Sequence, residues 1–179
     1  MTGGYTIKMM QDKHLEREKW FQQIVETHRG ILYKVARMYC PLESDREDLI
    51  QEILLQIWQS AHRYNPQFGL TTWLYRIAIN VAISFYRKNT ARQPDKTPIH
   101  EALTGMAAPE PAQQEHQLQL LEQFIQELNH FDKALMLLYL EEKSHHDIAE
   151  ILGITVSNVS TKVGRIKEKL KKRFTQHSS

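Results

Sequence analysis

The chain has 179 residues, 41% of them apolar and 25% charged, which is the balance of a soluble globular protein with room for one domain or two small ones. Its formal net charge is only +2, so the overall charge says little about its partners. The single cysteine excludes an internal disulfide, and no run reaches the roughly 18 apolar residues of a membrane span, so we expect a cytoplasmic protein without membrane insertion.

The N-terminal half is expected to form three helices, because apolar residues recur there at steps of three and four and glycines are few. The first helix runs from about Leu15 to Tyr39 and is ended by Pro41. The second lies in the stretch "SDREDLIQEILLQIW", which begins with a capping box formed by Ser44 and Glu47. The third covers about 72–88, after the turn sequence "NPQFG".

Each of these helices has an apolar face, so the three are expected to share a core. The residues predicted in it are Trp20, Ile24, Ile31, Val35, Met38, Leu49, Ile50, Ile53, Leu54, Ile57, Trp58, Trp73, Leu74, Ile77, Ala78, Val81 and Ala82. Cys40 is expected to pack as a small hydrophobic residue rather than to react.

Residues 90–116 are expected to be a flexible linker. This stretch contains no aromatic residue and four of the chain's six prolines. Such a composition buries too little apolar surface to offset the entropy lost on ordering. We therefore predict an all-α protein of two small domains, at 15–89 and 117–179, preceded by an N-terminal tail at 1–14.

The C-terminal domain is expected to contain a helix-turn-helix in the stretch "SHHDIAEILGITVSNVSTKVGRIKEKL". Ser144 and Asp147 form a second capping box, Gly153 permits a tight turn, and Thr155 is a candidate N-cap for the next helix. That helix has seven basic residues and one acid between Lys162 and Arg173. Its apolar stripe consists of Val159, Val163, Ile166, Leu170 and Phe174.

Three interpretations of this cationic helix are open: a solvated helix pair, a membrane-surface helix and a DNA-binding helix. The membrane interpretation is weak, because the apolar stripe is needed for packing against the neighbouring helices. The small residue Ala149, the glycine turn, the polar helix start and the basic tail together favour DNA. The residues expected to reach base edges or phosphates are Ser157, Asn158, Ser160, Thr161, Lys162 and Arg165.

Two surfaces of the N-terminal domain are also unusual. In the second helix, Asp48 and Glu52 are like charges at i,i+4 that repel each other, and they lie in line with Leu55 and Gln59. This line suggests a basic protein partner, with a simply solvated face as the alternative.

The third helix combines cations and aromatic rings, which is what unstacked bases require. Its polar residues opposite the predicted apolar stripe are Arg76, Asn80 and Arg87, and the aromatic residues nearby are Phe68, Tyr75 and Tyr86. We favour nucleic acid over a purely structural role for these polar residues, whereas Trp73 is expected to be a core residue.

Taken together, these stretches resemble the extracytoplasmic-function group (group IV) of bacterial sigma factors, the initiation subunits of RNA polymerase. The resemblance covers about 21–88 and 118–173 and rests on "DREDLIQEILLQIW", "TTWLYRIAINVAISFYRK" and "DIAEILGITVSNVSTKVGRIKEKL", in the family's order. It implies that the first domain is sigma region 2, that the second is sigma region 4, and that the linker threads toward the polymerase active-site channel.

The resemblance further implies an alternative sigma factor that binds core RNA polymerase, recognises promoter DNA and helps to open it. Core-polymerase contacts would be Asp45, Asp48, Gln51, Glu52 and Leu55. Contacts to the minus-ten element would be Arg76, Asn80, Arg87 and Lys88. Contacts to the minus-thirty-five element would be Ser157, Asn158, Ser160, Thr161, Lys162 and Arg165. An anti-sigma factor is a further partner that is usual in this family.

The chain departs from the family at a few positions. Ser84 stands where many relatives have aspartate, and Lys162 stands where arginine is common. Lysine cannot fork onto a guanine as arginine does, so the promoter sequence that is read is expected to differ. Gly164 and the pair Ile166–Lys167 also depart from the common pattern, which resembles Arg-Ala-Arg.

Two other functions compete with this interpretation. The first is a conventional helix-turn-helix regulator with an N-terminal sensing or dimerisation domain. The second is a small enzyme, which we do not favour, because no nucleophile pairs with a base and no metal-ligand spacing occurs. His145 and His146 are expected at a solvated helix start, and no catalytic residue, cofactor or metal ligand is predicted.

Overall fold

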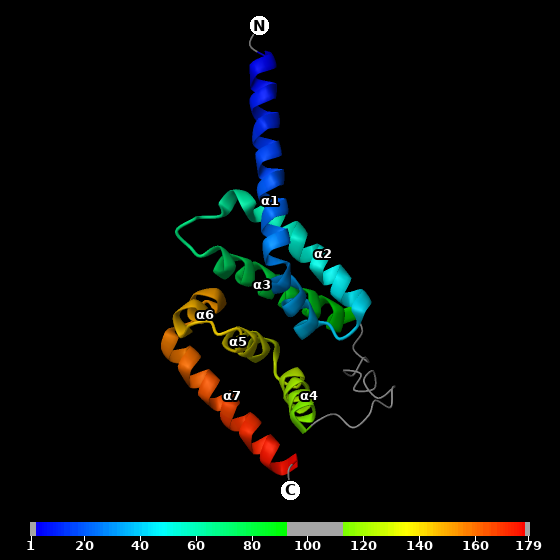
Figure 1. The fold of residues 1–179 in the computed structure, drawn as a ribbon, viewed down its shortest axis with the longest axis vertical. Coiled ribbons are helices and arrows are strands. Elements are labelled where there is room, and N and C mark those ends of the chain that lie inside the picture. Colours follow the sequence, from blue (N-terminus) through cyan, green and yellow to red (C-terminus); the bar gives the residue numbers. More distant parts are fainter. Residues whose placement is uncertain (1–2, 93–112, 178–179) are drawn as a thin grey trace. The chain divides into compact units, whose positions relative to one another are not determined.

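The computed structural model describes the backbone of residues 3–92 and 113–177 and the side chains of residues 15–89 and 119–176. Helices dominate these residues and no strand occurs among them, which confirms the predicted all-α fold (Figure 1). The elements are α1 (Gly3–Tyr39), α2 (Glu43–Ser60), the 3-10 helix η1 (Ala61–Arg63), α3 (Leu70–Arg92), α4 (Gln113–Gln126), α5 (His130–Leu140), α6 (His145–Leu152) and α7 (Val156–His177). No described helix combines the length and apolar character that crossing a membrane requires.

The chain divides into two compact units, Met1–Ala82 and Ile83–Ser179, so α3 begins in the first unit and ends in the second. Both ends of the predicted linker at 90–116 are helical, because α3 continues to residue 92 and α4 begins at residue 113. The centre of that linker, 93–112, lies outside the described residues.

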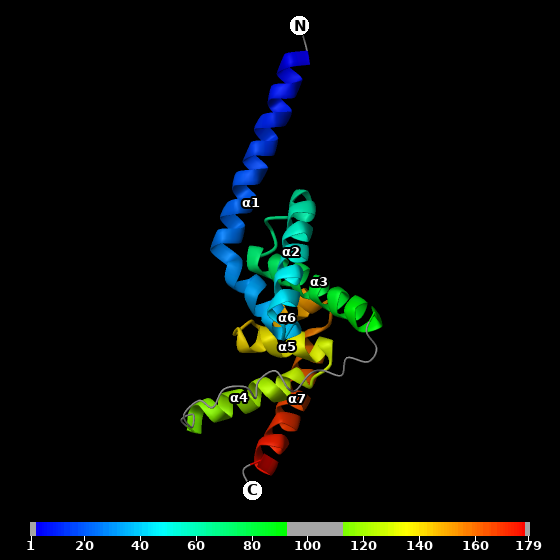
Figure 2. The same ribbon diagram turned by 90° about the vertical axis from the view of Figure 1, so that its right-hand side faces the viewer.

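The first helix is longer than predicted, since α1 begins at Gly3 instead of about Leu15. No proline interrupts the residues between these positions, and five of them in the second half of the stretch are good helix formers: Lys8, Met9, Met10, Gln11 and Lys13. Both views show the N-terminal turns of α1 extending beyond α2 (Figure 1, Figure 2).

The core of the first unit lies where α1 packs against α2. Leu49, Ile53 and Ile57 of α2 are completely buried, as their spacing predicts, and Val35 of α1 is buried equally well. Cys40 is 5% exposed, which confirms that it packs as a small hydrophobic residue. Burial raises the pKa of its thiol to about 12, and the nearby carboxylate of α2 adds to this shift, so the thiol is protonated at neutral pH.

The buried side of α3 differs from the prediction. The buried residues are Thr72, Leu74, Tyr75, Ala78, Ile79, Ala82 and Phe85. Trp73, Ile77 and Val81, which were expected in the core, are half-buried. Apolar residues occupy three consecutive positions in three places along this helix, at 73–75, 77–79 and 81–83, so periodicity alone left the orientation of the helix open.

Trp73 nevertheless has a structural role, because it belongs to an aromatic cluster with Trp20 and Tyr64. The ring centroid of Trp73 lies 5.1 Å from that of Tyr64 and 6.3 Å from that of Trp20. The predicted turn before α3 is formed by Asn65, whose side-chain oxygen accepts a 3.0 Å hydrogen bond from the amide of Gln67. The cluster and the turn hold the loop that joins η1 to α3.

The start of α2 corrects one prediction. Leu42 is the N-cap residue and makes no side-chain cap, so Ser44 lies inside the helix and the predicted capping box with Glu47 is wrong. Instead, the guanidinium of Arg46 donates a 2.8 Å hydrogen bond to the carbonyl of Pro41. The chain turns at the proline and enters the helix at once, which places the serine two positions too late to act as a cap.

The second unit contains the predicted helix-turn-helix, formed by α6 and α7. The hydroxyl of Ser144 accepts a 3.0 Å hydrogen bond from the amide of Asp147 at the start of α6. Gly153 ends this helix with φ 67°, in the left-handed region that favours glycine. The hydroxyl of Thr155 accepts a 3.2 Å hydrogen bond from the amide of Asn158, so all three predicted local features are confirmed.

The apolar stripe of α7 is also confirmed. Its buried residues are Val159, Val163, Ile166 and Leu170. α7 packs against α4, α5 and α6. Phe174 continues the stripe as a half-buried residue, and its ring meets Phe124 of α4 edge-on at a centroid distance of 5.2 Å. The opposite side of α7 is therefore available to a partner.

Candidate polymerase and nucleic-acid interfaces

The acidic face of α2, formed by Asp48, Glu52, Leu55 and Gln59, lies on the side of the helix away from its buried residues. Leu55 is 56% exposed in the midst of these polar side chains. Of the other predicted core-polymerase contacts, Gln51 is exposed and Asp45 is half-buried. An exposed leucine surrounded by carboxylates on a well-packed helix is suited to a partner with apolar and basic side chains.

The polar face of α3, formed by Arg76, Asn80, Arg87 and Lys88, is exposed along the helix. The aromatic residues near it differ in exposure. Tyr75 is only 2% exposed, so the expectation that it lies beside the polar face is wrong, because the helix is rotated relative to the predicted orientation. Tyr86 is half-buried, whereas Phe68 is 51% exposed on the loop before α3. Phe68 is thus the ring best placed to stack on a base.

The outward face of α7, formed by Ser157, Asn158, Thr161, Gly164 and Arg165, lies opposite the buried stripe, and each of these residues is exposed. The hydroxyl of Thr161 donates a 3.0 Å hydrogen bond to the carbonyl of Ser157, which is one turn earlier. A shallow depression lies on this side of the helix. It is lined by Ser160, Thr161, Gly164, Arg165, Glu168, Lys169 and Lys172.

Two of the residues predicted to contact the minus-thirty-five element lie on the flanks of α7. The hydroxyl of Ser160 is 3.0 Å from Nδ1 of His145, so it is engaged with α6. The ammonium of Lys162 lies 3.7 Å from the carboxylate of Asp132 and 5.1 Å from the ring centroid of Phe131, so it is directed toward α5. These two side chains are less well placed to reach base edges than those of the outward face.

Two more cations anchor α7 to its own unit. The ammonium of Lys167 donates a 3.3 Å hydrogen bond to the hydroxyl of Tyr139. Arg173 pairs with Glu127 at 2.5 Å. The remaining cations counted in the sequence are exposed: Arg165, Lys169, Lys171 and Lys172. Positive charge therefore remains available along α7 after the anchoring contacts have been made.

Sequence reasoning missed the residues of α5 that orient Lys162. Asn129 caps α5 and accepts a 2.9 Å hydrogen bond from the amide of Asp132. The amide group of Asn129 also donates a 2.7 Å hydrogen bond to one carboxylate oxygen of Asp132, and the other oxygen faces Lys162. The asparagine followed three residues later by an acid could have been recognised as a cap, but its link to α7 is a tertiary contact.

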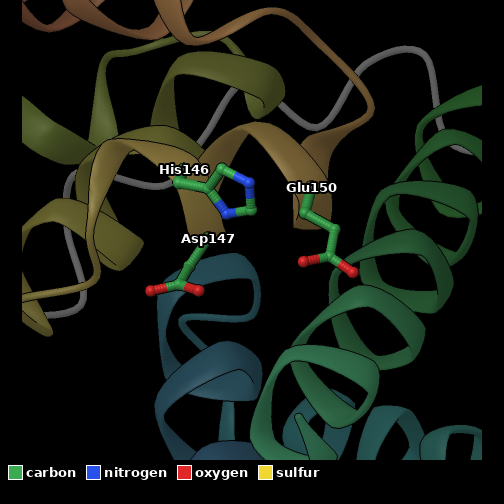
Figure 3. Close-up of side chains that lie close together, drawn as sticks. All are labelled: His146, Asp147 and Glu150. Atoms are coloured by element: carbon green, nitrogen blue, oxygen red, sulfur yellow. The ribbon is translucent and has the colours of Figure 1, made fainter. Parts of the chain in front are cut away.

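His146, Asp147 and Glu150 project from one stretch of α6 (Figure 3), with potential metal-binding atoms within 4.8 Å of one another. The Asp147 carboxylate already accepts a 2.6 Å hydrogen bond from the hydroxyl of Ser144. The capping of α6 therefore accounts for the position of Asp147, and the i,i+4 spacing of the helix accounts for that of His146 and Glu150.

Comparison with known families matches both halves of the chain. Residues 24–92 match Sigma-70 region 2, and residues 118–170 match Sigma-70 region 4. The match to region 2 disfavours the alternative of a conventional helix-turn-helix regulator, whose N-terminal domain would sense a signal or dimerise.

Curated relatives agree with this assignment. RNA polymerase sigma factor YlaC of Bacillus subtilis is 30% identical over 153 residues, which cover 83% of this chain and 88% of YlaC. ECF RNA polymerase sigma factor SigW of the same organism is 27% identical, over 86% of this chain and 88% of SigW. ECF RNA polymerase sigma factor SigE of Mycolicibacterium smegmatis is 25% identical, and the match covers 89% of this chain but only 63% of SigE.

Two solved structures share the fold. CnrH in complex with the cytosolic domain of CnrY has a TM-score of 0.64 at 20% identity, over 89% of this chain and 90% of that one. The sigma factor RpoE of Bartonella quintana, in complex with the anti-sigma factor NepR, has a TM-score of 0.68 at 23% identity, over 88% and 98%. Because both sigma-70 regions occur in order and a 30% identical relative is matched over 88% of its length, the chain belongs to the RNA polymerase sigma factors.

Proposed function

We propose that this chain is an alternative sigma factor of group IV, which binds core RNA polymerase, recognises the minus-thirty-five and minus-ten elements of promoters and helps to open the DNA. The observation that carries this proposal is the combination of three exposed faces in one chain that contains both sigma-70 regions. The polar face of α3 and the outward face of α7 suit nucleic acid, and the acidic face of α2 suits a protein.

Core RNA polymerase would bind the acidic face of α2. Asp45, Asp48, Gln51, Glu52 and Leu55 would meet the clamp helices of the largest polymerase subunit. Leu55 would supply the apolar centre of this contact, because its side chain is more than half exposed while the surrounding carboxylates provide a polar rim. The carboxylates would speed association with a basic partner and select it.

The minus-ten element would bind the polar face of α3. Arg76, Asn80, Arg87 and Lys88 would contact the separated non-template strand, with cations along its phosphates. We add Phe68 to this site, because its exposed ring lies on a loop that is held by neighbouring hydrogen bonds. In this assignment residues 15–89 form the region 2 domain, with residues 1–14 as its tail.

The minus-thirty-five element would bind the outward face of α7. Ser157, Asn158, Thr161 and Arg165 would reach base edges in the major groove, as the N-terminal part of a recognition helix does. Ser160 and Lys162 would contact DNA from the flanks of the helix. In this assignment residues 117–179 form the region 4 domain, and residues 90–116 link it to region 2.

We also propose a cytoplasmic location, where core polymerase and promoter DNA are found, and regulation by an anti-sigma factor. One structure of similar fold contains a sigma factor bound to an anti-sigma factor, which supports this idea. Such a partner would inhibit most directly by covering the acidic face of α2, because that face would otherwise bind the polymerase.

The proposal is tested by transcription in vitro with core polymerase from the protein's own bacterium and a library of that organism's promoter fragments. We expect the purified chain to start transcription at a subset of promoters that share both elements. Core polymerase without the chain provides the control. Failure to initiate on any fragment, together with tight binding of the chain alone to duplex DNA, would contradict the proposal and support a conventional regulator.

A further inference from the structure

Gly164 lies inside α7, where the fold gives no reason for a glycine. A methyl group added at this position would meet no described atom within 4 Å, so no neighbouring helix requires the small residue. Gly153 is the glycine with positive φ among the described residues, so the backbone conformation does not require glycine at 164 either. Glycine is among the poorest residues for a helix interior, because it loses more backbone freedom than any other.

The surroundings of Gly164 point to a partner outside the chain. It is exposed on the outward face of α7, beside Thr161 and Arg165, and it lines the shallow depression described above. Three cations and one carboxylate surround this depression: Arg165, Lys169, Lys172 and Glu168. A single exposed position without a side chain, in a depression lined mainly by cations among its charged residues, favours a polyanion that approaches the helix closely.

We propose that Gly164 is the position at which the backbone of α7 comes closest to promoter DNA, and that the depression receives the sugar–phosphate strand bordering the minus-thirty-five groove. This inference rests on the proposed function. The absence of a side chain at 164 lets α7 sit deeper in the groove than a bulkier residue would allow. Gly164 is thus a determinant of minus-thirty-five recognition, although it makes no hydrogen bond through a side chain.

Gly164→Ala tests this with two readouts that move in opposite directions. The melting temperature should rise by about 2–8 °C, because alanine favours the helix. The initiation ratio between a promoter with an intact minus-thirty-five element and one with that element scrambled should fall by about fivefold or more, because the methyl group would be overpacked against DNA. Gly164→Leu, which is larger but also a good helix former, should reduce the ratio further.

Gly30→Ala is the matched control, because Gly30 is also an exposed glycine inside a helix, with no described atom within 4 Å of an added methyl group. It should raise the melting temperature and leave the initiation ratio unchanged. The initiation ratio is measured with the full chain bound to core polymerase, and the melting temperature with the full chain alone.

Four results would overturn the inference. If the wild-type ratio is well above one and Gly164→Ala leaves it unchanged, this inference is wrong and the proposed function stands. The same holds if Gly164→Ala lowers the affinity for core polymerase and does not change the ratio. A lower melting temperature of Gly164→Ala would show that the fold itself needs the glycine. A wild-type ratio near one would overturn the proposed recognition of the minus-thirty-five element, and this inference with it.

Discussion

Nζ of Lys162 lies 3.7 Å from Oδ1 of Asp132, and the other oxygen of that carboxylate accepts a hydrogen bond from Asn129. The lysine side chain is 43% exposed, so it keeps a surface that a DNA phosphate can approach. An ammonium held at the flank of a recognition helix acts as a point charge, whereas base reading requires a side chain directed into the groove. Lys162 is therefore expected to hold the DNA backbone.

Lys162→Ala should accordingly weaken binding of the holoenzyme to every minus-thirty-five sequence by the same factor. We expect about threefold to tenfold weaker binding, and a slope of log affinity against log salt that falls by about 0.9, the value for one phosphate contact. Binding is measured by fluorescence anisotropy at several salt concentrations. Lys19→Ala, at an exposed position of α1, serves as the control. A loss confined to one base pair would show that Lys162 reads sequence instead.

The helix-turn-helix could be predicted in detail because its determinants are local. The cap at Ser144, the left-handed turn at Gly153 and the cap at Thr155 each depend on residues within one turn of the chain. The stripe of α7 was equally clear, because single apolar residues recur there at steps of three and four with mostly polar residues between them. The pair between Lys162 and Asp132 joins residues of different helices, so no sequence pattern announced it.

The errors have the same origin. Ser44 matches the capping pattern, but the pattern does not say where the helix begins, and the N-cap of α2 is Leu42, two residues earlier. In α3, neighbouring apolar residues fit more than one helix orientation, and only packing decides that Tyr75 is buried. The exposure of Asp48 and Glu52 was predictable because the buried stripe of α2 has a single possible phase.

Charge reversal on the acidic face of α2 tests the proposed polymerase contact. Asp48→Lys combined with Glu52→Lys should weaken binding to core polymerase by about tenfold or more, because charge complementarity would become repulsion. The melting temperature should change little, since both side chains are exposed. Affinity is measured by competition for core polymerase with the unmodified chain. Glu26→Lys on α1 is the control. An equal loss of affinity for core polymerase in both variants would contradict a specific contact through the acidic face of α2.

Phe68 is expected to act in promoter opening and not in stability. Phe68→Ala should slow opening by about tenfold, since stacking of a base on a ring contributes about 1–3 kcal/mol. Its melting temperature should stay close to that of the unmodified chain, because the ring is 51% exposed. Opening is followed with a fluorescent base analogue in the minus-ten element. Phe68→Trp keeps a stacking surface and should restore the rate, so slow opening in this variant as well would contradict base stacking.

Two serines with the same sequence pattern should differ in their contribution to stability. The hydroxyl of Ser144 accepts the amide of Asp147 at 3.0 Å and donates to its carboxylate at 2.6 Å, whereas Ser44 lies inside α2 and caps nothing. Ser144→Ala should therefore lower the free energy of unfolding of the second unit by about 1 kcal/mol. Ser44→Ala should change that of the first unit by less than about 0.5 kcal/mol, because alanine is the better residue within a helix. Denaturant titrations of the full chain, with helix content followed by circular dichroism, measure both effects. Equal losses in the two variants would mean that Ser44 does cap α2 in solution, and a neutral Ser144→Ala would mean that water replaces the cap of α6.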